Sequence, residues 1–118
     1  MARIILIDDD EPFRDLLAAL LSTAGHKVAT ASNGFDGAVK LRAEPADVLL
    51  TDIEMPYGGL PTIRVLRAEF PKLPIIAISG HEVKLQMAGA VGANRLLAKP
   101  FQFDCLNEAI AEVAPSAA

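Results

Sequence analysis

The sequence predicts an α/β fold, a three-layer αβα sandwich around a five-stranded parallel sheet, and two observations carry this prediction. Short, nearly continuous apolar runs alternate along the chain with segments whose apolar residues recur at helical spacing. Gly or Pro residues end many of these segments, as expected where one element stops and the next begins. Strands that are apolar throughout are typical of parallel sheets whose two faces are both covered by helices.

The apolar runs predict five strands. The first, Arg3-Ile4-Ile5-Leu6-Ile7, is rich in β-branched residues. The third contains Val48-Leu49-Leu50 and ends at Asp52, since Pro56 forbids a longer strand. The predicted strands cover residues 3–7, 27–31, 47–52, 74–79 and 95–99.

The helical spacing predicts five helices between and after these strands. In the first, apolar residues recur at helical spacing (Phe13, Leu16, Leu17, Leu20 and Leu21), Pro12 suits the first turn and Gly25 is the expected stop. The second contains a Gly and a Val and therefore needs packing to form. The predicted helices run from Pro12 towards Gly25, from Phe35 to Ala43, from Pro61 to Phe70, from Glu82 to Val91, and from Asp104, the expected cap, to Val113.

Length and composition limit the classes of function. A chain of 118 residues suits one domain, 1–118, with residues 113–118 expected to be a frayed tail. No apolar run is long enough to cross a bilayer and we recognise no signal peptide, so no membrane association is expected. The single cysteine, Cys105, favours a reducing cytoplasm and is interpreted as a small packing residue. The net charge of −4 argues against direct nucleic acid binding.

Polar side chains follow the predicted strands at their carboxyl ends. Right-handed crossovers leave few sheet topologies, and the flavodoxin-like order 2-1-3-4-5 is the natural one for five strands. In this order the first strand delivers Asp8 and Asp9, the third Asp52, the fourth Ser79 and the fifth Lys99 to one edge of the sheet. Ligands bind at this edge in open α/β sheets.

These groups suit phosphoryl transfer. Two carboxylates about 4 Å apart repel by roughly 4 kcal/mol at an effective dielectric constant of 20, so the cluster must protonate, spread out or bind a cation. Oxygen ligands without His or Cys favour Mg²⁺. Lys99 offers a cation to a phosphoryl oxygen, Ser79 offers a hydroxyl donor, and Asp52 is the expected carboxylate nucleophile.

Each of these signals also has a simpler structural interpretation. The acidic run 8–11 is equally typical of a cap at the start of the first helix. The pair Lys99-Pro100 is an ordinary strand exit, and Ser79-Gly80 is a common loop pair. Only their combination, in this order and each at a strand end, favours a site.

In this combination the chain resembles the receiver domain of bacterial two-component response regulators (CheY-like). The resemblance covers nearly the whole chain and is carried by Ile4-Ile5-Leu6-Ile7-Asp8-Asp9, Asp52-Ile53-Glu54-Met55-Pro56, Ile78-Ser79 and Lys99-Pro100-Phe101. It implies a phosphoacceptor signalling module of a two-component system or phosphorelay. The donor would be a histidine kinase or histidine phosphotransfer protein, and self-dephosphorylation would be slow.

The resemblance also implies a role for each site residue. Asp52 would be the phosphoacceptor, Asp9 a direct Mg²⁺ ligand, and Asp8 a ligand through water. Asp52 and the backbone carbonyl of Glu54 would complete the protein ligands of Mg²⁺. Lys99 would pair with the phosphoryl group, and the Ser79 side chain would rotate so that its hydroxyl contacts this group. The Lys99-Pro100 peptide would be cis.

The chain departs from the family pattern in three places. Leu96 occupies the usual aromatic position three residues before the lysine, which excludes an aromatic switch there. The loop 56–60, which contains Tyr57, is about one residue short, and the segment from Ser79 to Lys99 about two residues short. Together these departures affect the usual signalling surface of the family, around the fourth helix and fifth strand.

Two further residues, Glu54 and His81, each lie two positions beyond a site residue. In the family these positions border the path of the attacking water, which predicts that they set the rate of acyl phosphate hydrolysis. For His81 the alternative is an exposed residue at a helix start. Unchanged dephosphorylation rates in both alanine variants would exclude the hypothesis.

Three functions remain open from sequence alone. One is the phosphorylatable module, which would switch partner docking or relay phosphate onward. The second is an adaptor with the receiver fold that is poorly phosphorylated and acts by protein binding alone, as Leu96 would favour. The third is a Mg²⁺-dependent phosphohydrolase, against which the chain offers no lid or substrate pocket.

Overall fold

The sheet has the predicted architecture. The structure, a computed structural model, describes residues 1–55 and 58–114 and contains five strands in the order β2-β1-β3-β4-β5. All neighbouring strands pair in parallel. The strands are β1 (Arg3–Ile7), β2 (Lys27–Ala31), β3 (Val48–Asp52), β4 (Ile75–Ser79) and β5 (Arg95–Ala98). The α/β fold and the strand order predicted from the sequence are confirmed.

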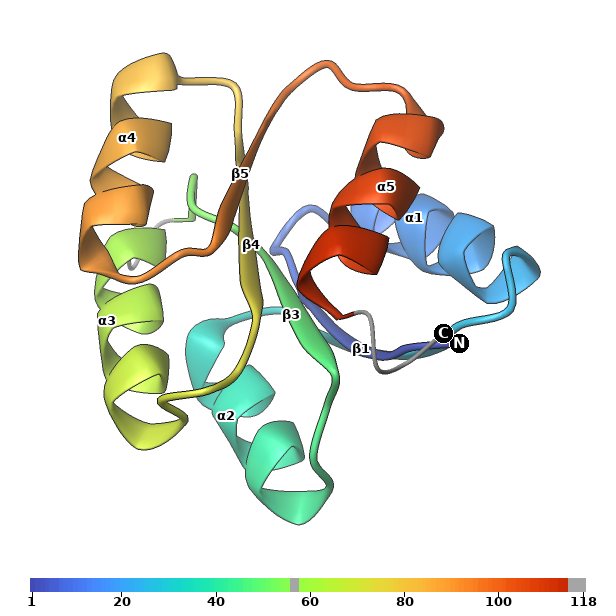
Figure 1. Ribbon diagram of the computed structural model, residues 1–118, viewed down its shortest axis with the longest axis horizontal. Helices are drawn as coiled ribbons and strands as arrows, with labels where there is room; N and C mark the ends of the chain where they lie inside the picture. Colours follow the sequence, from blue (N-terminus) through green and yellow to red (C-terminus); the bar gives the residue numbers. More distant parts are fainter. Residues whose placement is uncertain (56–57, 115–118) are drawn as a thin grey trace.

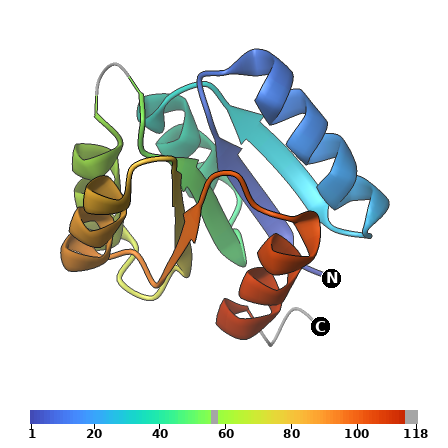
Figure 2. The same cartoon turned by 90° about the horizontal axis from the view of Figure 1, so that it is seen from above.

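Helices cover both faces of the sheet, as Figures 1 and 2 show. Helices α1 and α5 lie on one face, and α2, α3 and α4 lie on the other. Their bounds are α1 (Glu11–Thr23), α2 (Gly34–Ala43), α3 (Gly59–Glu69), α4 (Glu82–Val91) and α5 (Phe103–Val113). None of the helices in the described ranges is long and apolar enough to cross a lipid bilayer.

The core forms two apolar layers, one on each side of the sheet. In β1, Ile4 and Leu6 pack towards α1 and α5, whereas Ile5 and Ile7 pack towards α2 and α3. This alternation follows from the two-residue period of a strand. Every residue of the central strands β3 and β4 is buried. Each fully buried Leu or Ile contributes about 1.5–3 kcal/mol, so these strands hold the site edge rigidly.

Local signals explain most helix ends. Asp10 is the N-cap of α1, and its side chain accepts a hydrogen bond from the Phe13 N–H at 3.3 Å. Gly92 ends α4 with a φ of 130°, a conformation that favours glycine. Asn33 caps α2 by accepting the Asp36 N–H at 2.8 Å, so α2 begins one residue before the predicted Phe35.

Three predictions in and around α5 and α3 differ from the structure. The predicted cap Asp104 lies inside the first turn of α5, because the chain turns into the helix at Gln102. Cys105 is exposed, so its packing role is wrong: the buried face of α5 has helical spacing (Leu106, Ala109 and Ile110), and Cys105 lies outside it. Helix α3 begins at Gly59, two residues before the predicted Pro61.

The predicted frayed tail, residues 113–118, begins too early, because residues 113 and 114 belong to the folded part of the chain. Val113 is the last residue of α5, and Ala114 is buried with its N–H donated to the Ile110 carbonyl at 2.9 Å. Residues 56–57 and 115–118 lie outside the described residues, as does the rest of the predicted tail.

Candidate functional site

The strand ends bring four predicted residues to one edge of the sheet. Asp8 follows β1, Asp52 ends β3, Ser79 ends β4 and Lys99 follows β5. Asp52 pairs in register with Ile78, and Ser79 pairs with Ala98. Strands β3, β4 and β5 therefore end at nearly the same position along the sheet. Asp8, Asp52 and Ser79 are the buried polar or charged residues of the described ranges, apart from Thr51.

Both carboxylate oxygens of Asp52 have a donor. Oδ2 lies 2.6 Å from Lys99 Nζ, and Oδ1 accepts the backbone N–H of Glu54 at 2.7 Å. These two contacts fix the orientation of the carboxylate. Asp52 is also buried, at 4% exposed. A buried carboxylate of this kind depends on its partners, because an unpaired buried charge is strongly destabilising.

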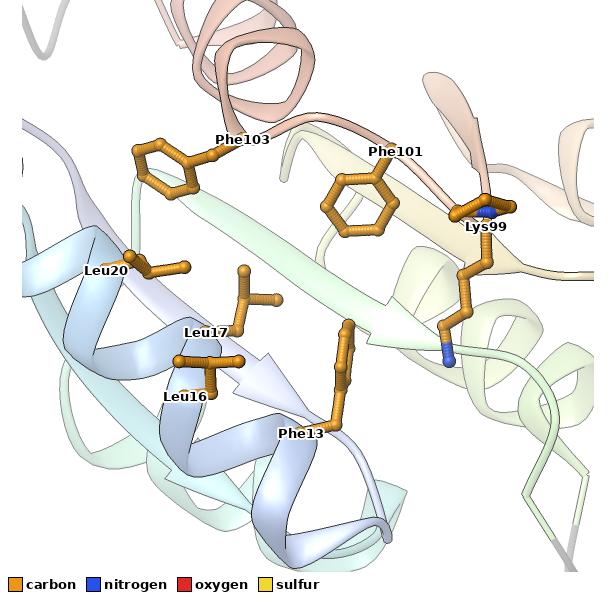
Figure 3. Close-up of a pocket in the computed structure, with 8 residues that line it drawn as sticks. Phe13, Leu16, Leu17, Leu20, Lys99, Phe101 and Phe103 are labelled. Atoms are coloured by element: carbon orange, nitrogen blue, oxygen red, sulfur yellow. The ribbon is translucent and has the colours of Figure 1, made fainter.

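The ammonium group of Lys99 lies between a carboxylate and an aromatic ring. Nζ is 4.6 Å from the ring centroid of Phe13, within cation–π distance, as Figure 3 illustrates. Phe13 in turn meets Phe101 edge to face, with centroids 6.4 Å apart. Desolvation lowers the pKa of Lys99, but the hydrogen bond and charge of Asp52 outweigh it, so the pKa is raised and the side chain stays cationic.

Asp8 is the most perturbed acid of the site. Burial raises its pKa from 3.8 to about 6, and the neighbouring charge of Asp52 adds to this effect. The Asp10 N–H donates to Asp8 Oδ1 at 2.9 Å, and this bond together with the Lys99 charge opposes the rise. A carboxyl group held beside a second buried carboxylate is a place where a cation is favourable.

The carboxylate oxygens at this site are suitable ligands for Mg²⁺, but only two of the three predicted carboxylates meet. Asp8 and Asp52 interact, whereas Asp9 is exposed and lines a neighbouring pocket with Asn33 and Met55. Within residues 1–55 and 58–114, no three His, Cys, Asp or Glu side chains are gathered so that they could hold a metal ion. The predicted meeting of three carboxylates is thus replaced by two acids and the ammonium group of Lys99.

The side chain of Ser79 is hydrogen-bonded to the side chain of Glu54. The Ser79 hydroxyl donates to Glu54 Oε1 at 2.8 Å and accepts the His81 N–H at 2.9 Å. Glu54 Oε1 also accepts the Gly80 N–H at 3.0 Å and lies 3.3 Å from His81 Nε2. Desolvation raises the pKa of Glu54, but the bonds from Ser79 and Gly80 outweigh it, so the pKa is lowered and Glu54 remains a carboxylate.

Two of the three departures from the family pattern, Leu96 and the short segment after Ser79, lie on the β5 side of the site. Leu96 is partly exposed on the edge strand β5, at 39%. The connection from β4 to α4 consists only of Gly80 and His81, while α4 has the predicted length. The Lys99-Pro100 peptide bond is cis, as predicted.

Sequence reasoning missed two contributions to the site. Phe13 was assigned only to the buried stripe of α1, yet its ring contacts Lys99. Glu54 was assigned a backbone carbonyl and a position near the water path, yet its side chain binds the Ser79 hydroxyl. The available signal for Phe13 was its position in the first turn of α1, close behind the acidic strand end.

Comparisons with known proteins agree with this geometry. A receiver domain protein from Clostridium thermocellum has the same fold, with a TM-score of 0.91, 28% identity, and coverage of 99% of this chain and 97% of that one. The chemotaxis protein CheY4 of Vibrio cholerae superposes with a TM-score of 0.88 at 29% identity, covering 96% and 98% of the two chains. Fold and site together define a CheY-like receiver domain.

The sequence comparisons give the family. Residues 4–111 match the family described as "Response regulator receiver domain", and the chain belongs to that family. It is 36% identical to Protein PilH of Pseudomonas aeruginosa over 93% of this chain and 95% of that protein. It is also 34% identical to the transcriptional regulatory protein ZraR of Salmonella typhimurium over 91% of this chain.

The family defines the function at the level of the module. The chain is a phosphoacceptor signalling module of the kind found in two-component response regulators. It spans 25% of the length of ZraR and 17% of the CAI-1 autoinducer sensor kinase/phosphatase CqsS of Vibrio cholerae, to which it is 32% identical.

Proposed function

We propose that Asp52 accepts a phosphoryl group from a phosphohistidine of a histidine kinase or histidine phosphotransfer protein. The observation that supports this most strongly is the 2.6 Å contact between Asp52 and Lys99, made at the carboxyl end of a central strand of a receiver fold. It joins a carboxylate nucleophile to a cation that can follow the transferred group.

The residues around Asp52 can each take a part in the transfer. A carboxylate oxygen of Asp52 forms a bond to phosphorus while the bond from phosphorus to the donor nitrogen breaks. Lys99, whose Nζ already contacts Oδ2, pairs with a phosphoryl oxygen and offsets its negative charge. Ser79 is the last residue of the neighbouring strand β4, and its hydroxyl donates to a second phosphoryl oxygen.

Mg²⁺ is the cofactor that we propose for this site. Asp8, Asp9, Asp52 and the backbone carbonyl of Glu54 are the groups that would hold it. When bound, Mg²⁺ neutralises negative charge on phosphoryl oxygens. The raised pKa of Asp8, which reflects burial and the charge of Asp52, supports a cation requirement at this position.

The phosphorylated domain would act through other proteins. We propose that residues 1–118 form one receiver domain, which works in the cytoplasm without binding nucleic acid directly. The new dianion would draw in Lys99 and Ser79 and shift the loops after β4 and β5, which changes docking or allows phosphate to pass onward. Beyond self-phosphorylation and slow self-dephosphorylation, no turnover of a substrate is proposed.

Labelling with acetyl phosphate and Mg²⁺ tests this function. The wild-type chain should take up one phosphoryl group per chain, and Asp52→Asn or an excess of EDTA should abolish the label. Absence of label in the wild type would instead favour an adaptor that acts by binding alone. Sustained release of phosphate over many turnovers would favour a phosphohydrolase.

A further inference from the structure

The hydroxyl that should meet the phosphoryl group is already bound elsewhere. Ser79 is fully buried, and its hydroxyl donates to Glu54 Oε1 at 2.8 Å. A serine hydroxyl has only one proton to donate. It therefore cannot donate to a phosphoryl oxygen on Asp52 while it donates to Glu54.

Several donors hold the Glu54 carboxylate against this part of the site. Oε1 accepts the Gly80 N–H at 3.0 Å as well as the Ser79 hydroxyl, and His81 Nε2 lies 3.3 Å away. The residue belongs to the β3–α3 connection, whereas its partners belong to the end of β4 and the connection to α4. One side chain thus ties two neighbouring strand ends together.

We propose that Glu54 is a positioning residue that holds the Ser79 hydroxyl away from the phosphoryl group. This inference rests on the proposed function and adds a regulatory step to it. The hydrogen bond between Ser79 and Glu54 must break before Ser79 can donate to the phosphoryl oxygen. Because hydrogen bonds to a carboxylate are strong, the contact favours the unphosphorylated arrangement.

Glu54→Ala removes this competition and keeps the backbone carbonyl of residue 54. The measurement is the affinity for beryllofluoride, a stable phosphoryl mimic, in buffer with Mg²⁺. We expect Glu54→Ala to bind about ten-fold more tightly than the wild type. Glu54→Gln, which keeps a neutral oxygen acceptor, should show a smaller gain, and a gain larger than that of Glu54→Ala would overturn the proposal.

A double-mutant cycle separates the hydrogen bond from simple repulsion. In a Ser79→Ala background Glu54 has no hydroxyl to hold, so Glu54→Ala should then leave the affinity unchanged. The same gain in both backgrounds would overturn the proposal, since it would come from the charge of Glu54. Glu82→Ala is the control for charge, because Glu82 is an exposed acid in the first turn of α4, and it should leave the affinity unchanged.

A second measurement needs neither Mg²⁺ nor a phosphoryl mimic. The Gly80 N–H donates to Glu54 Oε1, so its hydrogen exchange should be faster in Glu54→Ala than in the wild type. Unchanged exchange would overturn the proposed contact. If the wild type binds beryllofluoride but Glu54→Ala gives no gain, this inference alone fails. If no variant binds it, the proposed function fails together with this inference.

Discussion

Replacing Asp8 with asparagine should stabilise the protein at neutral pH. Burial and the charge of Asp52 raise the pKa of Asp8 from 3.8 to about 6, so the ionised folded state is penalised by about 3 kcal/mol. Asn keeps an oxygen that can accept the Asp10 N–H, now 2.9 Å from Asp8 Oδ1, but carries no charge. The free energy of unfolding of Asp8→Asn should therefore exceed that of the wild type at pH 7.5 by up to about 3 kcal/mol.

The stability difference between Asp8→Asn and the wild type should depend on pH. Between pH 3.8 and about 6 the unfolded chain has lost the proton of Asp8 while the folded chain keeps it. The folded state then binds more protons, so the wild type loses stability as the pH rises through this window. The advantage of Asp8→Asn should accordingly be small near pH 4, grow up to about pH 6.5 and stay constant above it.

Urea unfolding in buffer with EDTA, at several pH values, measures this difference. Asp9→Asn is the matched control: Asp9 is exposed, and its replacement should change the stability by less than about 0.5 kcal/mol. If Asp8→Asn is less stable than the wild type at pH 7.5, or if the stability difference does not depend on pH, then Asp8 does not destabilise the folded state in its ionised form.

Three further substitutions test individual contacts of the fold, each by urea unfolding. Lys99→Met leaves the buried carboxylate of Asp52 without its cation and should lower the free energy of unfolding by about 2 kcal/mol; no change would contradict the pairing. Gly59→Ala places a methyl group 2.2 Å from Ile53 Cα and should cost about 1–3 kcal/mol; a neutral effect would show that α3 does not start this close to β3. Arg67→Ala removes hydrogen bonds to backbone carbonyls at the ends of α3 and α4 and should cost about 2 kcal/mol; an unchanged midpoint would speak against this anchor.

Much of the fold follows from local patterns in the sequence. The bounds of β1, β2 and α4 were predicted to the residue, because β-branched runs and the stop at Gly92 mark them clearly. Helix starts were less predictable. Gly34 and Gly59 begin helices although glycine is a poor helix former, since the cap at Asn33 and close packing against Ile53 override propensity.

The site was predictable where it depends on strand ends and unpredictable where it depends on side-chain conformation. The meeting of Asp52 and Lys99 follows from topology alone. The bond between Ser79 and Glu54 does not, because these two side chains meet only in particular rotamers. The acidic run after β1 is both a helix cap and part of the candidate site: Asp10 caps α1, and Asp8 lies beside Asp52.

The role of Asp52 as phosphoacceptor is tested by identifying the residue that carries the phosphoryl group. After incubation with acetyl phosphate and Mg²⁺, borohydride reduces an aspartyl phosphate to homoserine, which peptide mass spectrometry locates in the sequence. We predict homoserine at position 52 of the wild type, and none in Asp52→Asn or when EDTA is present. Homoserine at another aspartate, or a labelled protein without any homoserine, would contradict it.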